Sequence, residues 1–308
     1  MTLRSDPDAR TWRAVRADVE ARLGDVVGSV AEAEARWMVL DAAGWSDAEL
    51  LVRQDEVAPT LARYRIDAMV ERRRSGEPLQ YVLGSWSFRG LDLMVDARVL
   101  IPRPETEVVC QVAIDEMVAL GARVGGTDPW SAGITTFSVA DLGTGSGAVA
   151  LALAAELPDA AVWASDASEA ALAVARANLA SIGTAATRVR LVHGDWFAAL
   201  PFELRGALRL VVSNPPYVSA AEHADLAPEV RIHEPYDALV SGESGLEDIE
   251  HLVAGALDWL EPGGVLVLEL APHQADLVAA CARAAGYGSV EIRPDLSGRA
   301  RALVARRP

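Results

Sequence analysis

Strands and helices alternate along the C-terminal part of the chain, and this pattern limits the fold most. From Thr135 onward, short apolar stretches rich in β-branched residues are separated by stretches with helical periodicity. The predicted strands are 136–141, 160–166, 188–193, 207–213, 263–270 and 300–306, and the predicted helices between them are 146–157, 168–182, 246–260 and 274–286. This alternation indicates right-handed βαβ units and a mostly parallel sheet. A ligand is then expected at the carboxyl ends of the strands, near the point where the strand order reverses.

The N-terminal part of the chain has helical periodicity throughout. Its apolar residues recur at helical spacing in three groups, which are Trp12-Val15-Val19-Leu23, Ala33-Trp37-Leu40 and Leu61-Tyr64-Met69. Breaks fall at Gly28, Gly44, Pro59 and the pair Gly76/Pro78. Residues 1–78 are therefore predicted to form a small helical domain. Because they contain no glycine-rich loop, we expect this domain to serve recognition or support.

Residues 79–101 have a different character, with two short stretches of β-branched and aromatic residues around Arg89-Gly90. They predict a β-hairpin that links the helical domain to a larger domain at 102–308. Pro104 suits the first turn of a helix running to about Leu120, where Glu105 and Glu107 favour the positive helix end. The glycine-rich residues 121–134 are predicted to form a loop.

A glycine-rich loop follows the first predicted strand of the sheet. The run from Asp141 to Gly147 reads Asp-Leu-Gly-Thr-Gly-Ser-Gly and leads into a helix. Glycines allow a close approach of the backbone to a ligand, and a helix N-terminus offers free N–H groups. The spacing differs from the G-x-G-x-x-G pattern of dinucleotide sites. S-adenosylmethionine fits, because an acidic residue at the loop can bind its ammonium group. The alternative is a plain strand–helix turn.

Acidic residues end the next two predicted strands. Asp166 can accept hydrogen bonds from both hydroxyls of a ribose, which suits NAD as well as S-adenosylmethionine. Its alternative role is to cap the helix that begins near Ser168. Asp195 and Trp196 at the third strand fit an adenine pocket, because the carboxylate can accept from the amino group and the ring can pack on the purine. Trp196 is equally compatible with the core.

The run Asn214-Pro215-Pro216-Tyr217 ends the fourth predicted strand of the sheet. Two prolines terminate the strand and fix the local backbone. A planar NH₂ group has two donors, of which the Asn214 side-chain oxygen can accept one and the Pro215 carbonyl the other. Tyr217 can stack on the planar group and exclude water. The run therefore predicts methylation of an amide or amine nitrogen, although Pro-Pro is also a common loop former.

Composition and charge indicate which classes of binding partner the chain favours. The formal net charge is −16 and the sequence pI is about 4.7, which argues against stable binding to a nucleic-acid backbone. Arg72-Arg73-Arg74 is predicted to be a solvated helix face. Cys110 and Cys281 are expected to be small core side chains in a reducing compartment. The five histidines show no metal-ligand spacing, so no metal is expected.

No apolar run approaches the roughly 20 residues that a membrane helix requires. The N-terminal residues also lack an apolar signal core. We therefore expect a cytoplasmic protein that does not associate with membranes.

Taken together, the motifs resemble the HemK-type (PrmC) release factor N5-glutamine methyltransferases over nearly the whole chain. The segments that carry the resemblance are Pro78-Leu79-Gln80-Tyr81-Val82-Leu83-Gly84, Ile101-Pro102-Arg103-Pro104-Glu105-Thr106-Glu107, Asp141 to Gly147, Gly194 to Phe197, Ser213 to Tyr217, Glu229-Val230-Arg231 with Glu234-Pro235, and Ser244-Gly245-Leu246. The resemblance implies an α/β fold with a Rossmann-like class I methyltransferase sheet, a small N-terminal helical domain and a β-hairpin linker.

The resemblance also implies a reaction, which is methylation of the glutamine side-chain nitrogen in the Gly-Gly-Gln motif of class I peptide chain release factors. S-adenosylmethionine would be the methyl donor, and a monomer is expected. The implied cofactor-binding residues are Gly143, Thr144, Gly145, Ser146, Gly147, Asp166, Trp196 and Asn214. Asn214, Pro215, Pro216 and Tyr217 would hold the glutamine, with Asn214, Pro215 and Tyr217 in catalytic roles. The N-terminal helices would dock the release factor.

The sequence departs from the family pattern in two places. A Leu-Glu-Ile-Gly-like stretch is usual after the last core strand, whereas this chain reads Leu268-Glu269-Leu270-Ala271-Pro272-His273-Gln274. Ala271 stands where the family pattern has its glycine. The loop at 121–134 is also longer than is typical.

Three other functions are open. A related enzyme that methylates a glutamine of a ribosomal protein resembles this chain, but its Arg-Pro segment tends to lack the Pro-Glu-Thr-Glu continuation. The second alternative is an N6-adenine methyltransferase of DNA or RNA, because the exocyclic amine of adenine is also a planar NH₂ group that must be oriented toward the methyl donor. Such an enzyme must also extract the base and cover it. The third alternative is a catalytically silent binding module that keeps the fold.

Overall fold

The computed structural model describes residues 10–125 and 136–308. The chain divides into two units, Met1–Gly84 and Ser85–Pro308. The division lies inside the segment 79–101 that we predicted to be a linker. Most of the predicted loop at 121–134 lies outside the described residues.

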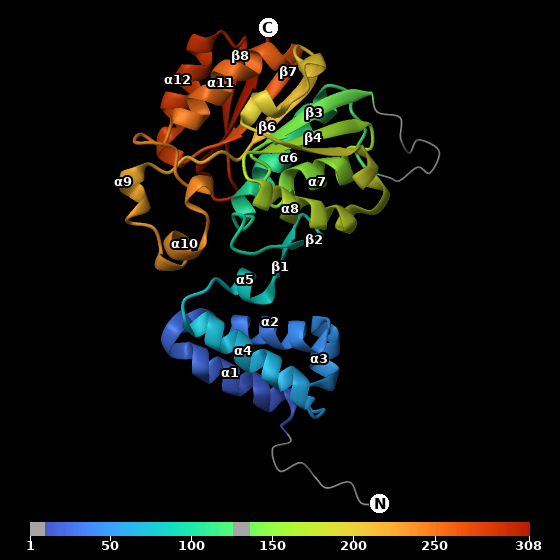
Figure 1. Cartoon of the computed structure of the whole chain (residues 1–308), viewed down its shortest axis with the longest axis vertical. Coiled ribbons are helices and arrows are strands. Elements are labelled where there is room, and N and C mark those ends of the chain that lie inside the picture. The colour runs from blue at the N-terminus through green and yellow to red at the C-terminus, as the bar shows by residue number, and fades with distance from the viewer. Residues whose placement is uncertain (1–9, 126–135) are drawn as a thin grey trace, which may run out of the picture. The chain divides into compact units, whose positions relative to one another are not determined.

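The first unit is helical and is coloured blue to cyan in Figure 1. Its helices are α1 (Trp12–Val27), α2 (Ala31–Ala43), α3 (Asp47–Arg53), α4 (Thr60–Arg74) and α5 (Leu79–Leu83). Local signals set their ends: the Thr11 side chain caps α1, Gly44 ends α2 in the left-handed region at φ 66°, and Ser46 with Glu49 forms a capping box at α3.

The buried faces of α2 and α4 differ from the predicted ones. Trp37, Leu61 and Tyr64 are 38%, 74% and 68% exposed, although they belong to the predicted apolar faces. The buried face of α4 carries the predicted Met69 together with Ile66 and Val70, which were not predicted. The cause is a polar pair in the core: Glu34 of α2 and Arg73 of α4 are both buried and joined by hydrogen bonds of 2.8 and 3.0 Å. A pattern of apolar residues alone does not reveal such a pair.

The predicted solvated face at Arg72-Arg73-Arg74 is corrected at Arg73, whereas Arg72 and Arg74 are exposed as predicted. Arg73 is buried against Glu34, and Arg72 donates to the Glu77 carboxylate and to the carbonyls of Tyr81 and Val82. Arg74 donates to the carbonyl of Arg22 at 2.6 Å. The three guanidinium groups therefore hold the helical unit together.

The predicted hairpin is shorter than residues 79–101. Residues 79–83 form α5, whose Leu79 and Val82 belong to the core of the helical unit, and Gly84 ends it at φ 78°. Strands β1 (Ser85–Phe88) and β2 (Leu91–Met94) then pair antiparallel. Their turn places Arg89 and Gly90 at φ 47° and 76°, and the Arg89 side chain ties the turn to Glu156 at 2.6 and 2.7 Å.

The second unit contains a sheet in the order β5-β4-β3-β6-β7-β9-β8. Its strands are β3 (Phe137–Leu142), β4 (Ala160–Asp166), β5 (Val189–His193), β6 (Leu208–Ser213), β7 (Leu260–Glu269), β8 (Ser289–Pro294) and β9 (Ala300–Arg306). The first five strands in this order pair in parallel, and β9 is antiparallel to both of its neighbours. Strand β8 was not predicted.

Helices cover both faces of this sheet (Figure 1). They are α6 (Pro104–Ala119), α7 (Ala148–Glu156), α8 (Glu169–Asn178), α11 (Glu247–Trp259) and α12 (Ala275–Ala285), with the short α9 (Ala220–His223) and α10 (Pro228–His233) after β6. Alternate residues of the strands, such as Val139 and Ala140, belong to two cores, one with α6 and α7 and one with α11 and α12.

The topology gives the sheet one point at which ligands are expected. Strand β3 lies between β4 and β6, so the chain moves outward in opposite directions from it. The crevice at the carboxyl ends of β3 and its neighbours is the usual ligand position in such sheets. Within the described parts of the chain, no helix is both long and apolar enough to cross a membrane.

Candidate active site

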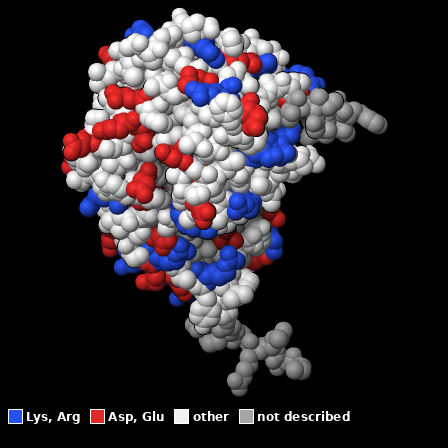
Figure 2. All heavy atoms as spheres, turned by 45° about the horizontal axis from the view of Figure 1, so that its top comes forward, with Lys and Arg blue, Asp and Glu red and all other residues white. Residues whose placement is uncertain are grey.

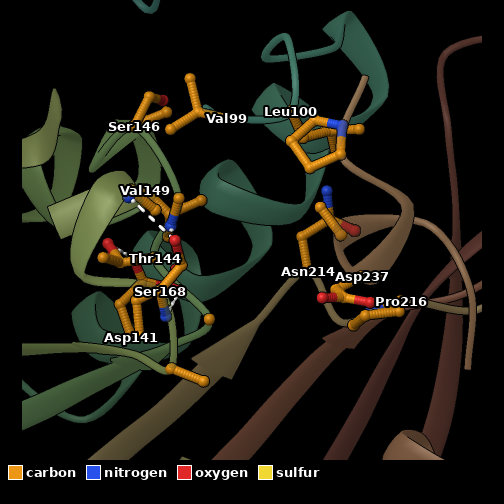
Figure 3. Close-up of a pocket in the computed structure, with 18 of the residues that line it drawn as sticks. Val99, Leu100, Asp141, Thr144, Ser146, Val149, Ser168, Asn214, Pro216 and Asp237 are labelled. Atoms are coloured by element: carbon orange, nitrogen blue, oxygen red, sulfur yellow. Dashed lines mark hydrogen bonds between the residues drawn. The ribbon is translucent and has the colours of Figure 1, made fainter. Parts of the chain in front are cut away.

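A cavity of about 570 Å³ lies at this crevice. Of the predicted site residues, Gly143, Thr144, Gly145, Ser146, Asp166, Trp196, Asn214 and Pro216 line it, whereas Gly147, Pro215 and Tyr217 do not. Figure 3 shows Thr144 and Ser146 on one side of the cavity and Asn214 and Pro216 on the other. Residues from two predicted motifs, far apart in the sequence, therefore face one space of the size usual for small-molecule sites.

Glycines shape the loop between β3 and α7. Gly143 and Gly145 have φ of 72° and 57°, which are costly for other residues. A Cβ at Gly143 would lie 3.1 Å from the Trp196 ring, so this glycine lets the ring approach the loop. A Cβ at Gly147 would meet Leu151 and Ala175 at 3.2–3.3 Å, which gives this glycine a packing role outside the cavity.

Asp141 at the end of β3 stabilises the loop from within. Its Oδ2 accepts from the Thr144 hydroxyl at 2.6 Å and from the Ala150 amide at 3.0 Å. Burial raises the pKa of Asp141 to about 7, against the lowering effect of these two hydrogen bonds. Asp141 also lines the cavity, so one carboxylate serves the loop and borders the ligand space.

Asp166 at the end of β4 accepts two backbone hydrogen bonds. Gly145 N–H donates to Oδ2 and Ser168 N–H donates to Oδ1, each at 2.8 Å. The side-chain cap of α8 is Ser168, which accepts from the Ala171 amide. Burial raises the pKa of Asp166 despite both bonds. Asp166 lines the cavity, and each of its carboxylate oxygens, which accepts one of these hydrogen bonds, has the capacity to accept another.

Trp196 and Phe197 after β5 have different roles. Trp196 lines the cavity and has φ of 40°, a strained conformation for a non-glycine residue. Asp195 lines the same cavity. Phe197 turns into the core instead, where its ring stacks on Trp259 at 5.8 Å between centroids.

The Asn214–Tyr217 run is held by residues from distant parts of the second unit. Asn214 Nδ2 donates to Thr106 Oγ1 at 3.3 Å, and Tyr217 OH donates to Glu269 at 3.1 Å. The Tyr217 carbonyl accepts from Gln274 Nε2 at 2.9 Å. The Tyr217 ring packs against the core beside α11 rather than lining the cavity. Its predicted stacking on an acceptor group stays a prediction.

Glu269 is a buried carboxylate that sequence reasoning did not assign to the site. It is the last residue of β7 and is 1% exposed. The Thr106 hydroxyl donates to its Oε2 at 2.8 Å. Burial raises its pKa to about 7, against the effects of Thr106, Arg301 and Tyr217. A charged residue at the end of an otherwise apolar strand was the available signal.

A second buried carboxylate joins two loops that border the cavity. Glu234 accepts from the Ile101 amide at 3.2 Å and forms an ion pair with Arg103. Burial raises the pKa of Glu234, and Arg103 opposes this. The neighbours Pro102 and Pro235 both line the cavity. This contact joins the Pro102–Glu107 and Glu234-Pro235 segments at the border of the cavity.

The departure at Ala271-Pro272 leaves the site intact. Ala271 has φ of −73° and ψ of 142°, a conformation that any residue adopts, so glycine is not required there. Pro272–Gln274 form a short 3-10 helix. Gln274, which is 2% exposed, donates to the carbonyls of Tyr217 and Gly245.

Surface charge and possible metal ligands bear on whether the described residues form a nucleic-acid surface or a metal site. On the face drawn in Figure 2, basic side chains form small groups that acidic and uncharged residues separate. Among residues 10–125 and 136–308, no group of three or more His, Cys, Asp or Glu side chains is placed to hold a metal ion. Cys110 is buried and Cys281 partly buried, and both are free thiols.

Comparisons with known proteins extend over both units. A family model described as PrmC N-terminal domain matches residues 14–84, and one described as Methyltransferase small domain matches residues 132–246. The chain is 45% identical to the release factor glutamine methyltransferase of Gloeobacter violaceus, over 77% of this chain and 78% of that protein. It is 38% identical to the protein of the same name from Cereibacter sphaeroides, over 97% of this chain and 99% of that protein.

A solved structure supports the fold. The hMettl16 catalytic domain, in complex with the MAT2A 3′UTR hairpin 6, matches with a TM-score of 0.52 at 13% identity. The match covers 82% of this chain and 84% of that chain.

Proposed function

The chain belongs to the family of release factor glutamine methyltransferases, and on that premise we propose that its cavity methylates a glutamine amide of a release factor. The methyl donor is S-adenosylmethionine, and the acceptor is the side-chain nitrogen (N5) of the glutamine in the Gly-Gly-Gln motif. The observation that carries the proposal is the meeting of the glycine loop, Asp166 and Asn214 in one cavity.

The residues around the cavity fit S-adenosylmethionine. Gly143 and Gly145 bring the backbone of the loop to the cavity wall, and the Trp196 ring covers Gly143. Asp166 would accept from the ribose hydroxyls, and Trp196 with Asp195 would bind the adenine. Asp141 and the loop would bind the methionine part. When bound, the cofactor supplies a methyl group that its sulfonium already activates, so the chain needs no metal or strong nucleophile.

Asn214 would hold the acceptor amide. A carboxamide nitrogen is a weak nucleophile because its lone pair is delocalised, so its orientation determines the rate. The Asn214 oxygen, in the cavity lining, would accept one N–H of the amide. The Pro215 carbonyl would accept the other, although Pro215 lies behind the cavity lining that Asn214 and Pro216 form. Tyr217 keeps this run in place through Glu269. In the transfer, the amide nitrogen would gain the methyl group, the sulfonium would lose it and leave as the thioether S-adenosylhomocysteine, and one amide proton would pass to solvent or a nearby acceptor.

A methyl-transfer assay with three acceptors tests the proposal. The protein is incubated with methyl-labelled S-adenosylmethionine and, separately, a purified class I release factor, a ribosomal fraction and duplex DNA. Label in the release factor, lost when the glutamine of its Gly-Gly-Gln motif is replaced by alanine, is the expected result. Label only in the ribosomal fraction would indicate the related glutamine methyltransferase, and label only in DNA an N6-adenine methyltransferase. Cofactor binding without any label would indicate a silent module.

We further propose that the helical unit docks the release factor and that the protein is a cytoplasmic monomer. The match of residues 14–84 to the PrmC N-terminal domain supports the docking role. Light scattering tests whether the protein is a monomer. A pull-down of release factor, comparing the full wild-type chain with the Tyr64→Ala variant on the exposed face of α4, tests the docking.

A further inference from the structure

The geometry assigns Thr106 and Glu269 as positioning residues that fix the orientation of the Asn214 carboxamide. Two hydrogen bonds in series join Asn214 to Thr106 and Thr106 to Glu269. The inference deepens the proposed function and rests on it, because Asn214 is the residue that would receive the acceptor amide. Thr106 lies in the cavity wall, whereas Glu269 does not line the cavity.

The direction of the first hydrogen bond follows from chemistry. An ionised carboxylate has lone pairs but no hydrogen to donate. The Thr106 hydroxyl, 2.8 Å from Glu269 Oε2, must therefore donate its one hydrogen to the carboxylate. Both groups are buried, at 4% and 1% exposure, so water does not compete for this bond.

The second hydrogen bond then has only one possible direction. With its hydrogen committed to Glu269, Thr106 Oγ1 can only accept from Asn214. The NH₂ group of Asn214 must point toward Thr106, at the observed 3.3 Å, and its oxygen must point elsewhere. The two ends of a carboxamide have nearly the same shape, so packing alone distinguishes them poorly. The Thr106–Glu269 pair makes the distinction.

This orientation matters for the reaction. The acceptor amide offers two N–H donors, and of the two ends of the Asn214 carboxamide only the oxygen can accept one of them. A flipped Asn214 would present its own N–H groups to these donors, leaving buried donors without partners. Asn214 in the observed orientation is therefore competent for the reaction, and the flipped one is not.

Glu269 also holds the far end of the run. Its second oxygen accepts from Tyr217 OH at 3.1 Å, so one carboxylate connects to both Asn214 and Tyr217. The charged groups that act on Glu269 are Arg301 of β9, which favours its ionised form, and Glu105 of α6, which disfavours it. Because burial raises the Glu269 pKa to about 7, the carboxylate that directs Thr106 forms as the pH rises through neutrality.

The side-chain amide of Asn214 can be observed directly by NMR. The sequence contains only two asparagines, Asn178 and Asn214. Protein labelled with ¹⁵N-asparagine therefore gives two side-chain NH₂ signals, and Asn214→Ala assigns them. Asn178 is an internal control, because its amide bonds to Met94 and to the Ser146 carbonyl. We expect Thr106→Val to shift the Asn214 signal and speed its hydrogen exchange at least tenfold, with Asn178 unchanged. Thr106→Ser keeps the wild-type signal.

Kinetics provide the second measurement. Thr106→Val and Glu269→Gln should lower kcat by about 10- to 100-fold, the loss typical of a misplaced reacting group, with little change in cofactor Kd. Thr106→Ser should restore kcat to within about threefold of wild type. Glu116→Gln is the matched control, since Glu116 is a buried glutamate of α6 that bonds to Arg306. The kcat of wild type should rise with pH toward a plateau above pH 7, a dependence that Glu269→Gln abolishes.

The outcomes separate the inference from the proposed function. An unchanged Asn214 signal in Thr106→Val overturns the inference, as does a kcat loss that Thr106→Ser does not restore. A wild-type protein that labels no release factor overturns the proposed function, while the Asn214 signals still decide the orientation. Variants that melt at the wild-type temperature but lose kcat support the positioning role.

Discussion

Asn214 is the side chain on which the proposed reaction depends most directly. It lines the cavity opposite the glycine loop, and its oxygen is free to accept from the acceptor amide. We expect Asn214→Ala to lower kcat by roughly 10²- to 10³-fold, as for loss of one preorganised polar group in other active sites. Cofactor Kd, measured by calorimetry, should change by less than tenfold. Wild-type turnover by this variant would show that the acceptor model is wrong.

Gly143 permits the close approach of Trp196 to the loop. In Gly143→Ala, the new Cβ would lie 3.1 Å from the ring on a backbone with φ of 72°. The ring and the loop must then separate, so we expect cofactor Kd to rise at least tenfold. Gly121→Ala is the control, because Gly121 has φ of 88° but no atom near its Cβ position and lies outside the cavity lining. Equal cofactor affinity in the two variants would contradict the role given to Gly143.

At the scale of elements, the Glu234–Arg103 pair joins the loop before α6 to the segment after α10. Glu234 has a side chain only 1% exposed, while that of Arg103 is 32% exposed. Arg103→Gln leaves the buried carboxylate without its partner, and we expect it to destabilise the protein by roughly 2–3 kcal/mol, below the cost for a fully buried pair. It should also raise KM for the release factor, since Pro102 and Pro235 border the cavity.

The double variant Arg103→Gln/Glu234→Gln provides the test of coupling. Removing both charges leaves no unpaired buried carboxylate, so its loss of stability should be smaller than the sum of the two single losses. Urea unfolding of all four proteins measures this. Additive losses would mean that the two side chains act independently.

Helices and strands were predictable from the sequence where burial of apolar residues alone determined them. Strands β3, β4, β6 and β7 are largely buried and read as near-continuous apolar runs, whereas the edge strand β5 is partly exposed. The predicted ranges of all five lie close to those observed. Strand β8 was missed because its half-buried sequence interleaves Glu291 and Arg293, which form salt bridges. The faces of α2 and α4 were misassigned because a buried ion pair, Glu34–Arg73, occupies core positions.

The site, like the secondary structure, was predictable in part. Glycine-loop residues and Asn214 belong to short motifs at strand ends, and the sheet brings strand ends together, so their meeting was predictable. The partners Thr106 and Glu269 were not, because their hydrogen bonds, Asn214 to Thr106 and Thr106 to Glu269, each span more than 100 residues of sequence. Tyr217 has the predicted position in the chain but faces the core and Glu269, since a buried hydroxyl requires a partner.

For the molecule as a whole, two buried carboxylates determine how stability changes near neutral pH. Burial raises the pKa of both Asp141 and Glu269 to about 7, from ordinary values of 3.8 and 4.5. Between roughly pH 4.5 and pH 7, the folded protein therefore binds more protons than the unfolded chain. Its free energy of unfolding should fall as the pH rises through this range and level off once both carboxylates are ionised, above their pKa of about 7.

The contribution of Glu269 can be isolated. A shift from 4.5 to about 7 corresponds to roughly 3 kcal/mol of stability that is present at pH 4 and lost by pH 8. We expect calorimetry of the full chain to show a melting temperature several degrees higher at pH 5.5 than at pH 8 for the second unit. Its transition is the one that S-adenosylhomocysteine shifts upward.

Glu269→Gln should reduce the slope of this dependence, because a neutral amide titrates nowhere in the range and only the contribution of Asp141 then remains. Exposed carboxylates with lowered pKa, such as Glu247 at about 2, lose their contribution only at more acidic pH, so they leave the window from 5.5 to 8 unaffected. Glu116→Gln, which replaces a buried glutamate away from the cavity, should keep the wild-type slope. A melting temperature that rises from pH 5.5 to pH 8 in the wild type would mean that Glu269 and Asp141 are ionised throughout, and that their partners outweigh burial.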